Sequence, residues 1–245
     1  MFTWFDLAWP WIGAVFAAAL IVLLFATNLL RSDRGMPRHR DLRWLSFLAV
    51  AVYLVHNIEE YGIAANGVFH AFPDVLCTTL GQPTYPGCGI PPVFYLFVNL
   101  PLVWIAGPLA ALLWGRIRLA ALTLWGVIAV NALVHIVPAI VQREYDPGLV
   151  TAVILFVPLS VLTGRAILAQ YRRPAIPLLV GAGALLHAVL AGSALLYLRG
   201  AIPEWLLLAA QPAVIVVGYL IVWRATNAVA RAGGAVREGP PKTDR

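Results

Sequence analysis

Apolar residues follow one another along this chain in long blocks that show no polar face. Seven blocks have the roughly 20 apolar residues that a helix needs to cross a hydrocarbon core of about 30 Å. An amphipathic surface helix would show polar residues every three or four positions, and the blocks lack that period. We therefore predict an all-α, polytopic membrane bundle with seven transmembrane helices, at about 8–30, 42–64, 91–114, 117–142, 149–169, 176–198 and 203–224.

Composition supports a membrane protein with one folded domain. Of the 245 residues, 61% are hydrophobic and 11% are charged, and the mean hydropathy is +0.84. These values exclude a soluble globular domain of this length and make the lipid bilayer the main partner. The seven-helix domain is expected to cover residues 1–232. The segment 233–245 holds Gly, Pro and charged residues without apolar periodicity, and is predicted to be a disordered cytoplasmic tail.

Basic residues divide unevenly between the two sides of the predicted bundle. All but two of the 17 Lys and Arg residues, Arg143 and Arg199, fall on one side. By the positive-inside rule this side is cytoplasmic, so the N-terminus lies outside and the C-terminus lies in the cytoplasm. The pattern predicts a multi-pass protein of the cell inner membrane. A basic rim facing lipid accounts for the net charge of +6, and no motif indicates nucleic acid.

One long connection, 66–90, carries both cysteines. By the topology above it is extracytoplasmic, and Cys77 and Cys88 in an oxidising compartment favour a disulfide over two free thiols. The loop is also rich in aromatic and apolar residues. Its length and content predict a lid over the outer mouth of the bundle.

Ionisable residues inside two predicted spans indicate a functional site. His56, Glu59 and Glu60 are related by i, i+3 and i+4, so they share one side of a helix. A charged group at the bilayer centre costs about 3 kcal/mol on insertion scales, which makes unpaired carboxylates there unlikely as packing residues. His135 lies in a parallel span, about as far below the outer end as His56. We expect the two spans to share a site.

The spacing of these residues suits a metal ion. His56, Glu60 and His135 are predicted to bind Zn²⁺ with one open position, and Glu59 to act as general base on bound water. Further polar residues lie in the same layer of the spans and are predicted to bind substrate or support the ligands: Tyr53, Asn99, His187 and Gln211. The alternative for Asn99, Asn131 and Gln211 is hydrogen bonding between helices, and for His187 a bond to a backbone carbonyl.

Three motifs carry a family resemblance. His56–Glu60 (HNIEE), Asn131–His135 (NALVH) and Tyr145–Thr151 (YDPGLVT) resemble successive motifs of bacterial HXXEE-domain membrane proteins, whose function is undefined. The resemblance covers about 42–165. It implies a site of His56, Glu59, Glu60, Asn131 and His135, with Asn131 beside the catalytic groups, but no reaction. The YDPG stretch reads as an outer turn, so Asp146 is expected to form the turn, and Tyr145 or Asp146 to reach a substrate.

Several functions fit these residues. We expect an intramembrane, metal-dependent enzyme that performs hydrolytic or acid/base chemistry on a small lipophilic or membrane-embedded substrate reached from the outer face. An iron pair is chemically possible, although bundles that hold one use more carboxylates. A metal-free, glutamate-dependent protease is a second enzyme class. A transporter, or a haem redox protein with His56 and His135 as axial ligands, is the non-enzymatic alternative.

Overall fold

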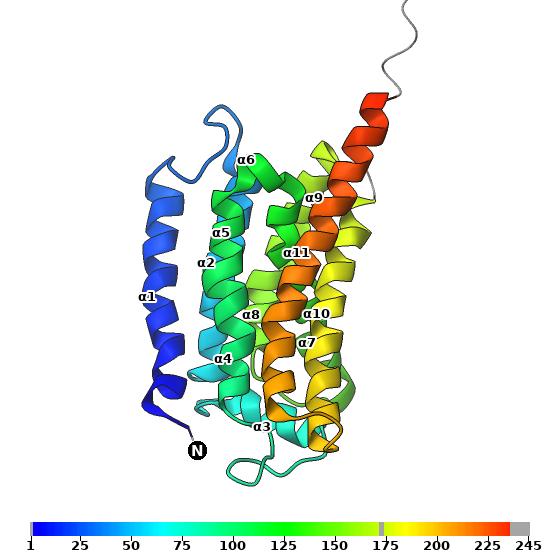
Figure 1. Cartoon of the computed structure of the whole chain (residues 1–245). Helices are drawn as coiled ribbons and strands as arrows, with labels where there is room; N and C mark the ends of the chain where they lie inside the picture. The colour runs from blue at the N-terminus through cyan, green and yellow to red at the C-terminus, as the bar shows by residue number, and fades with distance from the viewer. Residues whose placement is uncertain (1, 172–173, 236–245) are drawn as a thin grey trace, which may run out of the picture.

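The protein is a bundle of long, roughly parallel helices, seen from the side in Figure 1. The computed structural model describes residues 2–171 and 174–235, and its regular elements there are all helices, as predicted. In chain order they are α1 (Trp4–Ala26), η1 (Arg38–Arg40), α2 (Leu42–Tyr61), α3 (Ala71–Thr79), α4 (Val93–Asn99), η2 (Leu100–Ala106), α5 (Gly107–Leu112), α6 (Trp114–Ile117), η3 (Arg118–Leu122), α7 (Thr123–Gln142), α8 (Leu149–Thr151), η4 (Ala152–Phe156), α9 (Val157–Gln170), α10 (Ala175–Leu198) and α11 (Glu204–Ala235).

Six helical stretches of the described chain are long and apolar enough to cross a membrane: Trp4–Ala26, Val93–Leu112, Trp114–Gln142, Leu149–Gln170, Ala175–Leu198 and Glu204–Asn227. The protein is therefore a membrane protein by length and composition. Helix α2 has 20 residues and is not among the six. Its polar residues lower its hydropathy, yet most of its side chains are buried inside the bundle. It lies between α1 and α7 and contacts both.

Side-chain caps fix where the first two long helices begin. The Thr3 side chain accepts from the Asp6 N–H, and the Asp6 carboxylate accepts from Thr3, so α1 begins four residues before the predicted 8. Buried Asp41 caps α2 by accepting from the backbone N–H groups of Arg43 and Trp44. It also accepts from Ser32, which fixes the connection from α1. The beginning of α2 is thus held on both sides.

Prolines interrupt two of the spans. The π-helix η2 contains Pro101, and the π-helix η4 is followed by Pro158 at the start of α9. Proline lacks the N–H of the regular ladder, which gives a local reason for the wider turns. The predicted span at 117–142 is also irregular, because η3 separates α6 from α7.

The 66–90 connection contains a helix that the hydrophobic pattern did not predict. Helix α3 lies across one end of the bundle, beneath the end of α2 (Figure 1). Cys77 of α3 forms a disulfide with Cys88. Cys77 is fully buried in a cluster with Tyr61 of α2 and Phe94 of α4. The connection is therefore anchored to the bundle.

The last helix is longer than predicted. Helix α11 continues to Ala235, beyond the expected end at 224, so the first three residues of the predicted tail are helical. The rest of that tail, 236–245, lies outside the described residues.

Candidate metal centre

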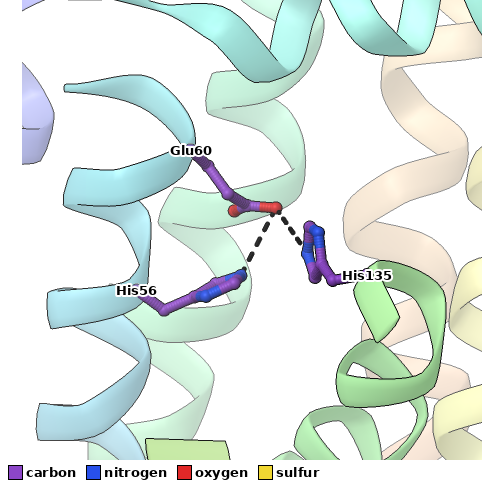
Figure 2. Close-up of side chains that lie close together, drawn as sticks. All are labelled: His56, Glu60 and His135. Atoms are coloured by element: carbon purple, nitrogen blue, oxygen red, sulfur yellow. Dashed lines mark ion pairs between the residues drawn. The ribbon is translucent and has the colours of Figure 1, made fainter. Parts of the chain in front are cut away.

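Three buried side chains from two helices meet at one point. His56 and Glu60 lie one turn apart on α2, and His135 comes from α7 (Figure 2). Glu60 Oε1 is 3.4 Å from His56 Nε2 and 3.2 Å from His135 Nε2. Both histidines are fully buried and Glu60 is 3% exposed. The sequence-based expectation that spans 42–64 and 117–142 meet at these residues agrees with this arrangement.

The distances suit one small cation. Donors at about 2.0–2.1 Å from a tetrahedral ion are about 3.3–3.4 Å apart, close to both contacts of Glu60 Oε1. One ligand atom from each of the three residues lies within 4.8 Å of the other two. Each imidazole Nε2 is buried and makes no hydrogen bond; its polar neighbour is Glu60 Oε1, with which it forms an ion pair only when the ring is protonated. Buried polar atoms without hydrogen bonds are costly, and with neutral rings this group could hold a metal ion.

The partner of His135 sets which nitrogen carries the proton. His135 Nδ1 lies 2.5 Å from Asp146 Oδ1. A carboxylate accepts, so Nδ1–H donates to it, and in the neutral ring Nε2 then carries the lone pair on the side of Glu60. A carboxylate behind the ligating ring is the usual support of a metal-binding histidine.

A hydroxyl plays the same role for His56. His56 Nδ1 lies 2.7 Å from Thr151 Oγ1, and that hydroxyl is 2.5 Å from Glu59 Oε2 and 3.2 Å from Gly148 O. The single hydroxyl hydrogen goes to one of these two acceptors, so Oγ1 accepts from His56. His56 Nε2 therefore also keeps its lone pair. When both rings are neutral, two nitrogen lone pairs and a carboxylate oxygen converge with no donor among them.

Glu59 occupies a different position from the one expected of a general base on bound water. Its carboxylate accepts four hydrogen bonds, and all four donors belong to the turn 145–151: the Tyr145 hydroxyl at 2.6 Å, the Val150 N–H at 3.0 Å, and the N–H and hydroxyl of Thr151 at 2.7 and 2.5 Å. The carboxylate is thus committed to the turn. Glu59 fixes the turn that carries the supports of both histidines.

Tyr145 fastens this turn to the end of α2. Its hydroxyl donates to Glu59 and accepts from the Ala65 N–H at 2.9 Å. Burial, and then the hydrogen bond to Glu59, raise the pKa of Tyr145 above its usual range, so the phenol keeps its proton. Tyr145 was expected to contact a substrate. In the structure its hydroxyl hydrogen bonds to Glu59 and its oxygen accepts from Ala65, so the hydroxyl already has both a donor and an acceptor within the chain.

Gly148 and two phenylalanines enclose the centre. Gly148 has a φ of +105°, and a Cβ there would lie 2.7 Å from His135 Cε1 and 2.8 Å from His56 Cε1. Phe156 of η4 lies against His56, with ring centroids 4.3 Å apart. Phe72 of α3 lies 5.7 Å from the His135 ring. Backbone and aromatic rings therefore close the centre on several sides.

The other predicted polar residues do not join the three ligand atoms. Asn131 donates to the Tyr53 hydroxyl at 2.8 Å, and the Tyr53 ring meets the His56 ring edge to face, 5.7 Å between centroids. This pair supports the centre from one turn deeper on α2 and α7. Asn131 was predicted to be catalytic, with hydrogen bonding between helices as its alternative, and its bond to Tyr53 joins α7 to α2.

Gln211 and His187 have the structural roles named above as alternatives, whereas Asn99 bonds within its own helix. Asn99 donates to the Tyr95 carbonyl of its own helix. Gln211 donates to Ser193 Oγ and so joins α11 to α10. His187 Nδ1 donates to the Gly183 carbonyl at 2.8 Å, one turn earlier on α10.

Sequence reasoning missed the supports of the ligands. Asp146 was expected to form the turn or to touch a substrate, and Thr151 had no assigned role, yet these two contact the Nδ1 atoms of His135 and His56. Both residues lie in the third motif. The available signal was that Asp146 and Thr151 lie in a motif that follows the two motifs carrying His56, Glu60 and His135.

Comparison with protein families gives one match. Residues 47–163 match the model of a family described as a protein of unknown function with an HXXEE motif. The 47–163 segment is an HXXEE domain. The domain includes all three ligand residues, together with Glu59, Asp146, Gly148 and Thr151. Neither comparison with curated proteins nor comparison with solved structures gives a match.

Proposed function

We propose that the HXXEE domain binds one divalent metal ion, Zn²⁺, through His56 Nε2, Glu60 Oε1 and His135 Nε2. One observation carries the proposal. The two Nε2 atoms and Glu60 Oε1 converge in a buried place, while the Nδ1 atoms of the two imidazoles already have hydrogen-bond partners in Thr151 and Asp146. Two nitrogens and one carboxylate oxygen form a donor set typical of catalytic zinc. An iron pair fits less well, because Glu59 and Asp146 are bonded elsewhere.

Haem also fits poorly. Axial histidines lie on opposite faces of a porphyrin, whereas Glu60 Oε1 stands within 3.4 Å of both Nε2 atoms. The Cα of Gly148 is also close enough that a Cβ would touch both rings. These contacts leave no space for a porphyrin plane between the two imidazoles.

Three protein donors leave one position of a tetrahedral ion for water or substrate. A metal ion in such a site lowers the pKa of bound water to about 7 and supplies a nucleophile for hydrolysis. The chain's own contribution is to hold the two rings in one tautomer, to keep water out with Phe72 and Phe156, and to present Glu60 as the anionic ligand. We assign the domain a hydrolytic or acid/base reaction on a small lipophilic substrate.

We infer that the substrate arrives at the end of the bundle where α3 lies. The centre is near the end of α2 beside α3, and Phe72 of α3 contacts the His135 ring. Two features support an outward orientation of this end: the Cys77–Cys88 disulfide, which persists in oxidising compartments, and the arginine-rich connections at the opposite end. In this orientation α2 is a seventh crossing and the N-terminus lies outside.

Metal analysis of the purified full chain tests the proposal. We expect close to one zinc ion per chain, and a loss of at least tenfold in zinc content for His56→Ala and His135→Ala. His187→Ala is the matched control, because His187 also lies in a span but bonds to a carbonyl of its own helix. It should keep its metal. Wild-type protein without metal after zinc loading, or equal loss in His187→Ala, would contradict the site.

A further inference from the structure

A second cavity lies at the opposite end of the bundle, between the connection that holds η1 and the side of α9. Its volume is about 650 Å³. Two guanidinium-bearing residues line it, Arg40 from η1 and Arg165 from α9. Much of the remaining wall is apolar and comes from Leu162, Ala166 and Ala169 of α9. The cavity begins where α2 begins, whereas the metal centre lies near the end of α2.

The arginines around this connection divide into two kinds. Arg31, Arg38 and Arg43 donate to backbone carbonyls and so hold the connection in shape. The guanidinium groups of Arg40 and Arg165 make no hydrogen bond or ion pair with the described part of the chain. The two arginines that line the cavity are therefore not used to build the fold.

The position of Arg40 is fixed even though its side chain is free. The Gln170 side chain of α9 donates to the Arg40 carbonyl at 2.7 Å. Asp41, the next residue, accepts three hydrogen bonds from Ser32 and Asp33 and is fully buried. The backbone of η1 is thus held against α9, and Arg40 is kept on the same side as Arg165.

The apolar part of the wall follows one face of α9. Residues 162, 166 and 169 are spaced by four and three, so they form a stripe on one side of the helix. Leu162 is 41% exposed and points away from the bundle core. Arg165 lies beside this stripe, near the C-terminal end of α9. At such a position a long basic side chain can reach the membrane interface.

We propose that this cavity binds an anionic phospholipid, with its phosphate between Arg40 and Arg165 and an acyl chain along Leu162 and Ala169. Guanidinium groups bind phosphate oxygens through paired hydrogen bonds. A free phosphate would use only the two arginines, whereas a phospholipid also covers Leu162 and Ala169, the exposed residues of the apolar stripe; Ala166 between them is buried. Basic pockets beside membrane helices are suited to acidic headgroups. The site does not depend on the metal centre.

Native mass spectrometry of the full chain tests the site. The protein is equilibrated with equal amounts of phosphatidylglycerol and phosphatidylcholine, and bound lipid is counted. We expect wild type to retain phosphatidylglycerol in preference, and Arg40→Gln/Arg165→Gln to lose that preference by on the order of tenfold. Arg34→Gln/Arg116→Gln is the matched control, because it removes two exposed charges that do not line the cavity. It should retain the preference.

Two further measurements sharpen the result. Inorganic phosphate at millimolar concentration should not displace the lipid; displacement would show a free-phosphate site and overturn the lipid assignment. Zinc content reports folding at the far end and should be equal in wild type and both double variants. An unchanged lipid preference in Arg40→Gln/Arg165→Gln, or an equal loss in the control, would show that the cavity does not select the lipid.

Discussion

Glu59 and Glu60 are neighbours on α2, yet their carboxylates meet different surroundings. Glu60 faces the two unpartnered imidazole nitrogens, whereas Glu59 is surrounded by hydrogen-bond donors of the turn 145–151. Adjacent residues on a helix project about 100° apart, which is enough to separate the two roles. The motif thus provides Glu60 as a proposed metal ligand and Glu59 as the residue that holds the turn 145–151. That turn orients His56 and His135.

Replacing Glu59 by Gln tests this division. Gln keeps one acceptor oxygen and places an NH₂ group against donors of the turn, so we expect a loss of about 1–3 kcal/mol in stability. The melting temperature in detergent should fall, and zinc affinity should weaken because Thr151 loses its anchor. Glu204→Gln, at the exposed start of α11, is the control. A variant with unchanged stability and metal but no turnover would instead make Glu59 the general base.

Gly148 offers a second test at the residue scale. Gly148→Ala would combine the strain of a positive φ, about 1–2 kcal/mol, with a Cβ 2.7 Å from the His135 ring. Gly67→Ala is the matched control, since its φ is +82° and a Cβ there meets nothing within 4 Å. We expect both variants to lose some stability and only Gly148→Ala to lose zinc. Equal zinc content in the two variants would mean that the turn does not approach the centre this closely.

Helices α7 and α10 approach each other closely at a pair of glycines. A Cβ at Gly126 would lie 2.1 Å from the Leu179 carbonyl oxygen, and one at Gly183 would lie 2.3 Å from the Gly126 carbonyl oxygen. The two backbones touch because both helices carry glycine at the crossing, as small residues allow in membrane bundles. Since α7 carries His135, this crossing sets how far that ligand lies from α2.

Alanine at position 183 should move the two helices apart. We expect Gly183→Ala to lower the melting temperature and to reduce zinc occupancy, because His135 is displaced with α7. Gly181→Ala, two residues earlier on α10, adds the same methyl group where nothing lies within 4 Å and should have little effect on either quantity. If the two variants behave alike, the crossing does not position the ligand.

At the scale of the whole molecule, α1 begins and α11 ends at opposite ends of the bundle (Figure 1). The end with α3 carries the disulfide, and the other end carries η1 and its arginines. This asymmetry is the basis of the orientation proposed above, with the α3 end outside.

Reporter fusions test that orientation. A reporter active only outside the cytoplasm should be active when fused after Asn66, and one active only in the cytoplasm should be active after Gln170. Both results follow if α2 crosses the membrane and the arginine-rich end is inside. A cytoplasmic reporter active after Asn66 would reverse the orientation and remove the proposed outer route for the substrate.

The apolar pattern alone was enough to predict the long helices of the bundle, though not α3, because the cost of burying backbone polar groups in lipid leaves a long apolar segment little alternative to helix. Local signals also explain the disulfide loop and the three ligands, since His56 and Glu60 are one turn apart and His135 lies at the same depth. The tertiary structure decided the rest. That Asp146 and Thr151 fix the tautomers, that Glu59 binds the turn, and that Gly148 closes over both rings depend on how the turn 145–151 folds back onto α2. The contacts of Thr151 with His56 and Glu59 join residues 95 and 92 positions apart, and that of Asp146 with His135 spans 11 positions across a turn; no periodicity along the chain encodes them.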